Sequence, residues 1–121
     1  MGVFMKIAVI GSRTIKITNL ESYLQNADEI VSGGATGVDE CAANFARAHG
    51  IKLTVFLPDY RRYGRGAPII RNRAIVEYAD EVVAFWDGKS RGTHSVIKYS
   101  DQLGKSCRVI ILEDIPLSDL K

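Results

Sequence analysis

The sequence has few of the residues that build metal centres or disulfide frameworks. Its two cysteines are Cys41 and Cys107, and its two histidines are His49 and His94. None of these residues has the spacing of a zinc site, so the sequence predicts no metal, and both thiols are expected to be reduced and buried. No cofactor is predicted either, because no segment carries the complete glycine fingerprint of dinucleotide-binding or P-loop proteins.

Long apolar runs and an excess of one charge are also absent. Residues 1–10 are too few and too polar, at Lys6, for a secretory signal, and no later run approaches the roughly 20 apolar residues of a membrane span. We therefore expect a cytoplasmic protein with no membrane partner. The net charge is +2 with 25% charged residues, which is too balanced to demand nucleic acid as a partner.

The 121 residues suffice for one globular domain, expected to span 1–121 with a polar tail at 113–121. Apolar runs predict strands at 6–10, 29–32, 52–57, 81–86 and 108–112. Helical spacing predicts helices at 19–26, 38–48, 68–78 and 93–103, and 59–66 is expected to be a loop. This alternation predicts an α/β fold with a five-stranded parallel sheet between helices, for which we prefer the strand order 3-2-1-4-5.

Glycine loops follow the first, second and fourth predicted strands. They read Gly11-Ser12-Arg13-Thr14, Gly33-Gly34-Ala35-Thr36-Gly37 and Gly88-Lys89-Ser90-Arg91-Gly92-Thr93. Each offers glycines and hydroxyl groups, and the first and third add cations, so each has groups that hold a phosphate. The preferred strand order places these loops side by side, which predicts one binding site for the phosphate of a ligand.

Residues near the loops extend this candidate site. Thr36 and Asp39 have the spacing of a capping box, and Asp39 is also a candidate ligand for ribose hydroxyls. Arg71 and Arg73 lie on different faces of their helix, so we expect one of them to face the site. Trp86 is a candidate for stacking on a base, the alternative being a core tryptophan with a hydrogen-bonded N–H. The full candidate set is Gly11, Ser12, Arg13, Thr14, Gly33, Gly34, Ala35, Thr36, Gly37, Asp39, Arg71, Asn72, Trp86, Lys89, Ser90, Arg91, Gly92 and Thr93.

Together these motifs resemble the SLOG superfamily of Rossmann-like nucleotide-binding domains, most closely the stand-alone YspA/YpsA-type members. The resemblance rests on Gly11-Ser12-Arg13, on the segment 32–39, on Arg71-Asn72 and on the segment 86–93, and it covers nearly the whole chain. It implies a three-layer Rossmann-like fold, a nucleotide or nucleotide-derived ligand and a homodimer. The leading hypothesis is a small domain that binds or senses such a ligand.

Two branches of the superfamily give alternative functions. The Lonely Guy phosphoribohydrolases release a base from a nucleoside monophosphate, and Gly92 and Thr93 resemble the start of their Gly-Thr-x-x-Glu motif. Val96 stands where that motif has its catalytic glutamate, and valine cannot transfer a proton. An N-glycosidase of this type would need another carboxylate, for which Glu77, Asp39 and Asp87 are the candidates, so whether the protein is an enzyme stays open.

The other branch is the DNA-processing protein DprA, whose resemblance implies binding of single-stranded nucleic acid. The segment 60–65 alternates aromatic and basic side chains, as such sites require. The residues concerned are Tyr60, Arg61, Arg62, Tyr63 and Arg65. Nucleic acid is therefore an alternative partner, which the nearly balanced charge of the chain does not favour.

Overall fold

Five parallel strands form the central sheet of the computed structural model, which describes residues 4–120. Their order is β3-β2-β1-β4-β5. The strands are β1 (Lys6–Gly11), β2 (Glu29–Ser32), β3 (Lys52–Val55), β4 (Glu81–Trp86) and β5 (Ser106–Ile111). All four neighbouring pairs are parallel. The predicted fold class and strand order are confirmed, with β3 and β5 at the edges.

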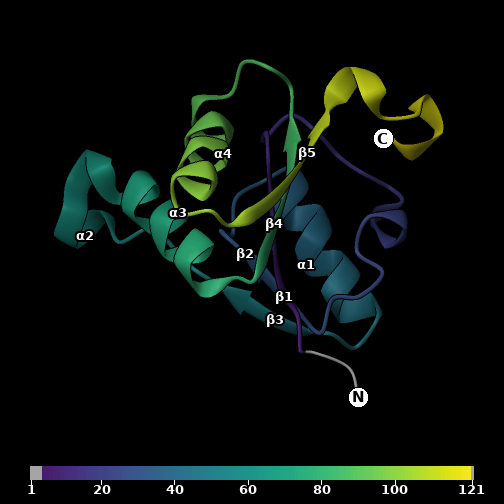
Figure 1. Cartoon of the computed structure of the whole chain (residues 1–121), viewed down its shortest axis with the longest axis horizontal. Helices are drawn as coiled ribbons and strands as arrows, with labels where there is room; N and C mark the ends of the chain where they lie inside the picture. Colours follow the sequence, from purple (N-terminus) through teal and green to yellow (C-terminus); the bar gives the residue numbers. More distant parts are fainter. Residues whose placement is uncertain (1–3, 121) are drawn as a thin grey trace.

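Helices cover both faces of the sheet (Figure 1). Helix α1 (Val38–Ala48) covers one face, while α3 (Ala67–Tyr78) and α4 (Arg91–Gln102) cover the other. Alternate residues of β1 enter the two cores: Ile7 and Val9 pack on the α1 side, and Ala8 and Ile10 on the opposite side. Central strands are buried on both faces, which explains their continuous apolar runs.

The helix predicted at 19–26 is wrong, because that segment holds a single 3-10 turn, η1 (Leu20–Ser22). Leu20 and Leu24 are buried, and the ring of Tyr23 packs edge-on against Phe85 at 5.1 Å between centroids. Asn19 precedes the turn without capping it and instead donates to the hydroxyl of Ser22. The apolar spacing here reflects side chains that anchor an irregular segment to the core.

The loop predicted at 59–66 contains helical turns, so that prediction is also wrong. Asp59 caps α2 (Tyr60–Tyr63) by accepting the N–H of Arg62 at 3.1 Å, and η2 (Gly64–Gly66) connects α2 to α3. Figure 1 shows α2 projecting away from the sheet. The cysteines Cys41 and Cys107 are free, as expected, but half-buried rather than buried.

The segment predicted as a polar tail packs against the domain. It includes η3 (Leu112–Asp114) and η4 (Leu117–Asp119), and Ile115 between them is buried. Thr18 donates its N–H to the carbonyl of Asp119 at 2.8 Å, and Ile17 forms an isolated bridge with Leu120. This segment therefore ties the chain after β1 to its carboxyl-terminal part. Within residues 4–120, no helix is long and apolar enough to cross a membrane.

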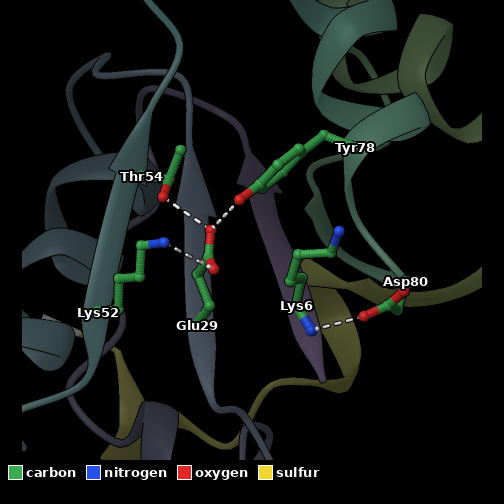
Figure 2. A network of polar contacts seen from close by, with 6 residues as sticks. All are labelled: Lys6, Glu29, Lys52, Thr54, Tyr78 and Asp80. Carbon is green, nitrogen blue, oxygen red and sulfur yellow. Dashed lines mark hydrogen bonds and ion pairs between the residues drawn. The ribbon is translucent and has the colours of Figure 1, made fainter. Parts of the chain in front are cut away.

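A polar network joins β2, β3 and α3 at the amino-terminal edge of the sheet (Figure 2). Glu29 is buried, and its Oε2 accepts hydrogen bonds from Thr54 at 2.7 Å and from Tyr78 at 2.6 Å. Its Oε1 lies 3.5 Å from Nζ of Lys52. Burial by itself raises the pKa of Glu29, but these hydrogen bonds and the lysine charge outweigh it and lower that pKa below its ordinary value.

Candidate phosphate-binding site

A cavity of about 390 Å³ opens where the segments after β1, β2 and β4 meet the start of α3. Strands β2, β1 and β4 are neighbours, so their carboxyl ends meet at one edge of the sheet. The cavity is lined by Gly11, Ser12, Arg13, Thr14, Ala35, Asp39, Pro68, Arg71, Asn72, Asp87, Ser90, Gly92 and Thr93. All three predicted loops thus contribute to one hollow.

The lining includes most of the candidate residues and adds two more. These are Pro68, at the predicted start of the helix 68–78, and Asp87, which the sequence suggests only as a substitute for a catalytic glutamate. The candidate residues that do not line the cavity are Gly33, Gly34, Thr36, Gly37, Trp86, Lys89 and Arg91. No signal in the sequence distinguishes lining residues from their neighbours within a loop, because that depends on how the loops pack.

Glycines in the first two loops allow their backbones to pack closely. Gly37 has φ of +74°, and a Cβ at this position would overlap the backbone carbonyl of Arg13. A Cβ at Gly11 would likewise overlap the side chain of Val38, at the start of α1. These two glycines are therefore required for loop packing, whatever the ligand.

The amino terminus of α1 already holds a negative charge. Gly37 is the residue before the helix and has no side chain to cap it, so the predicted capping box does not form. Asp39 is only 6% exposed, and its Oδ2 accepts the N–H of Ala35 at 3.1 Å. Ser32 accepts the N–H of Gly34 at 3.3 Å. Two N–H groups of the second loop therefore have acceptors within the protein, and the carboxylate of Asp39 would repel a phosphate there.

Burial raises the pKa of Asp39. Backbone hydrogen bonds from Ala35 and Gly33 and the charges of Arg71 and Arg13 lower this pKa, without cancelling the effect of burial. A raised carboxyl pKa in a cavity is a common property of ligand-binding sites.

The amino terminus of α4 combines a carboxylate, that of Asp87, with N–H groups that have no acceptor among the described residues. Ser90 caps the helix, accepting the N–H of Thr93, and Asp87 Oδ1 accepts the N–H groups of Lys89 at 2.9 Å and Ser90 at 2.8 Å. These two hydrogen bonds lower the pKa of Asp87. Within residues 4–120, the N–H groups of Arg91 and Gly92 have no acceptor in the protein. Since Gly92 lines the cavity, the positive end of the α4 dipole is available to an anion.

Arg71 links α3 to the segments after β2 and β3. Its Nη1 donates to the carbonyls of Gly33 and Phe56, and its Nε donates to Asn72 Oδ1 at 2.7 Å. Much of its guanidinium is therefore engaged by the protein, although the residue still lines the cavity. Arg73 is exposed and lies over the ring of Tyr99, so Arg71 lines the cavity and Arg73 does not.

Trp86 and Val96 both lie outside the cavity lining. Trp86 donates Nε1 to the carbonyl of Ser90 at 3.0 Å and stacks against His94, so its indole N–H is hydrogen-bonded within the third loop. Val96 is 1% exposed and packs in the core between α3, α4 and the sheet. Of the carboxylates considered as substitutes for a catalytic glutamate, Asp39 and Asp87 line the cavity and Glu77 does not.

A larger hollow of about 590 Å³ lies between the η1 segment and the end of α1. It is lined by Asn19, Glu21, Ser22, Leu24, Gln25, Ala27, Phe45, His49 and Ile51. No lysine or arginine is among these residues, so this hollow offers no permanent cation to neutralise a phosphate.

Two solved structures of DNA processing protein A resemble this fold. The protein from Helicobacter pylori, described for its single-stranded DNA binding mode, has a TM-score of 0.71 and 23% identity, over 97% of this chain and 68% of that one. The protein from Streptococcus pneumoniae has a TM-score of 0.74 and 21% identity, over 92% of this chain and 53% of that one. At these identities the likeness concerns the fold. No curated protein sequence matches the chain.

The family comparison concerns the first two loops. Residues 5–63 match the model of the YspA, cpYpsA-related SLOG family. This segment runs from β1 through α2 and contains both the first and the second glycine loop. The resemblance predicted from the sequence is confirmed over residues 5–63, just under half of the chain, which are similar to the YspA, cpYpsA-related SLOG family.

Proposed function

We propose that this protein binds a nucleotide or a nucleotide-derived ligand, with its phosphate at the amino terminus of α4. The observation that carries the proposal is that three loops and α3 line a single cavity, at which the N–H groups of Arg91 and Gly92 at the start of α4 have no acceptor among the described residues. The family match and the DNA-processing relatives support a binding module for nucleotides or nucleic acid.

The groups around this terminus suit a phosphate. The N–H groups of Arg91 and Gly92 lack acceptors within the protein, and the hydroxyls of Thr14 and Ser90 belong to the lining. Arg13 also lines the cavity and is exposed, so its guanidinium is free to neutralise the phosphate. Lys89 and Arg91 are exposed nearby and add positive potential without lining the cavity.

Calorimetric titration with the four ribonucleoside monophosphates tests this proposal, and native mass spectrometry of the purified protein tests for a retained nucleotide. Arg13→Gln is expected to weaken binding by about tenfold, since an exposed charge-assisted hydrogen bond is partly screened. Lys89→Gln, which removes a neighbouring charge outside the lining, is the matched control and should change affinity by less than about threefold. Equal effects of the two variants would contradict this placement of the phosphate.

Single-stranded nucleic acid is a second candidate ligand, favoured by the surface of α2. Tyr60 is 56% exposed and Tyr63 is 40% exposed. Arg61, Arg62 and Arg65 are exposed beside them. Exposed aromatic rings stack on bases, and the interleaved arginines neutralise the backbone phosphates of a strand.

Fluorescence anisotropy with a labelled oligothymidylate at increasing salt tests this second candidate. Binding through α2 should weaken as salt rises, and Tyr60→Ala should lower the affinity by about fivefold or more. Arg47→Gln, which removes an exposed charge on α1, is the control and should have little effect. Absence of binding at low salt would exclude the α2 surface as a nucleic-acid site.

A further inference from the structure

We infer that the cavity selects a ribose phosphate, with Asp39 accepting hydrogen bonds from adjacent hydroxyls of the sugar. This inference rests on the proposed phosphate position at α4. It assigns a ligand group to the opposite side of the same cavity, where α1 begins.

The carboxylate of Asp39 has one oxygen bound by the protein and one available. Oδ2 accepts the N–H of Ala35, and the backbone N–H of Gly33 also interacts with this carboxylate. No hydrogen bond to Oδ1 with normal geometry is formed among residues 4–120. No fully buried side-chain oxygen in that part of the chain lacks a partner. Oδ1 is therefore accessible. Because Asp39 is only 6% exposed and lines the cavity, a ligand reaches this oxygen through the cavity.

The chemistry of this oxygen defines what it can bind. A carboxylate accepts hydrogen bonds and donates none, so the facing group of the ligand must be a donor and cannot be a phosphate. A cationic donor would be repelled by Arg71, because Arg71 Nη1 and Asp39 Oδ2 both lie beside Gly33. A Cβ at Gly33 would lie 2.8 Å from Arg71 Nη1 and 3.0 Å from Asp39 Oδ2. A neutral hydroxyl donor fits both the carboxylate and the guanidinium.

The two ends of the cavity therefore favour opposite groups. The α4 terminus has unpaired N–H groups in addition to those that Asp87 accepts and, with Arg13 in the lining, favours an anion. The α1 terminus carries the Asp39 carboxylate and favours a hydroxyl donor. A sugar phosphate joins both groups in one small molecule. Vicinal hydroxyls add a second donor to the same carboxylate, which distinguishes ribose from 2-deoxyribose.

Calorimetric titration with ribose 5-phosphate, 2-deoxyribose 5-phosphate and inorganic phosphate tests the inference on the wild-type protein. We expect ribose 5-phosphate to bind about tenfold or more tightly than the deoxy sugar. Asp39→Asn keeps the side-chain volume and should reduce this preference to less than about threefold. Glu40→Gln, which removes the neighbouring exposed carboxylate, should leave the preference intact.

The outcomes separate this inference from the proposed function. Equal binding of the two sugars to the wild-type protein, or an unchanged preference in Asp39→Asn, would overturn the role of Asp39 while the phosphate site stands. Binding of none of the probes, ribonucleoside monophosphates included, would overturn both. Tighter binding of a ribonucleoside monophosphate than of ribose 5-phosphate supports a ribonucleotide as the source of the sugar, and equal binding supports a free sugar phosphate.

Discussion

Asp39 and Ala35 are joined by a hydrogen bond of 3.1 Å from the backbone N–H of Ala35 to the buried carboxylate. This bond places a negative charge at the positive end of α1, which is electrostatically favourable. Burial of the charged carboxylate away from water is unfavourable. The net result is a raised pKa, so the folded protein holds the Asp39 proton more tightly than the unfolded chain does. Such a group lowers stability at neutral pH.

Asp39→Asn is accordingly expected to raise the urea midpoint of unfolding at pH 7. The advantage should disappear as the pH falls below the ordinary carboxyl pKa of 3.8, since the wild-type carboxyl is then protonated in both states. Urea unfolding of both proteins across this range checks the prediction. A variant less stable than wild type at pH 7 would show that the charges of Arg71 and Arg13 outweigh burial.

Glu29→Gln should have the opposite effect. The lowered pKa of Glu29 means that its contribution to stability is present above its ordinary pKa of 4.5 and is lost as the pH falls through the folded value. We expect the variant to lose about 1–3 kcal/mol at pH 7, because a charged acceptor of hydrogen bonds from Thr54 and Tyr78 is replaced by a neutral one.

Urea unfolding measures this loss. The difference in unfolding free energy between the variant and the wild-type protein should shrink below pH 4.5. The exposed Glu21→Gln is the control, expected to change stability by less than about 0.5 kcal/mol. A loss for Glu29→Gln that is independent of pH would point to packing rather than charge.

Gly37→Ala tests the contact between the first two loops. A Cβ at this position would overlap the Arg13 carbonyl, and the positive φ adds backbone strain, so the expected loss is about 3 kcal/mol or more. Gly50 has φ of +64° with no atom within 4 Å of its Cβ position, so Gly50→Ala should cost only about 1–2 kcal/mol. Thermal unfolding of both variants checks the prediction, and equal losses would contradict the role of the loop contact.

Arg71→Lys tests whether the guanidinium holds the cavity wall together. Lysine cannot reproduce the separate hydrogen bonds to Gly33, Phe56 and Asn72, so we expect a loss of about 1–3 kcal/mol in urea unfolding. Arg73→Lys, two residues away on the exposed face, should change stability by less than about 0.5 kcal/mol. Similar values for the two variants would show that the hydrogen bonds of Arg71 contribute little.

The sequence predicts the fold better than it predicts the details of the site. The buried strands and their order follow from continuous apolar runs such as 81–86, whose predicted and observed bounds coincide. The helix prediction for 19–26 is wrong because buried leucines can anchor an irregular backbone to the core as readily as a helix. The capping box at Thr36 failed because tertiary contacts place Gly37 before α1 and turn Asp39 toward Ala35.

The convergence of the loops followed from the strand order, but the division of roles within them did not. A glycine required for loop packing, as at Gly37, has the same sequence signature as one that contacts phosphate. Pro68 joins the lining because α3 begins beside the cavity, which depends on the path of α2 and η2. The single domain, the homodimer and the identity of the ligand stay predictions.

The close contact between Gly37 and the backbone of Arg13 bears on how fast a ligand can bind. Two walls of the cavity touch through main-chain atoms, so they cannot separate without disrupting the ends of β1 and α1. A ligand then enters a site that exists before it arrives, and association needs no closing of these loops. The observed rate of binding is expected to rise linearly with ligand concentration, without the plateau that a slow conformational step imposes.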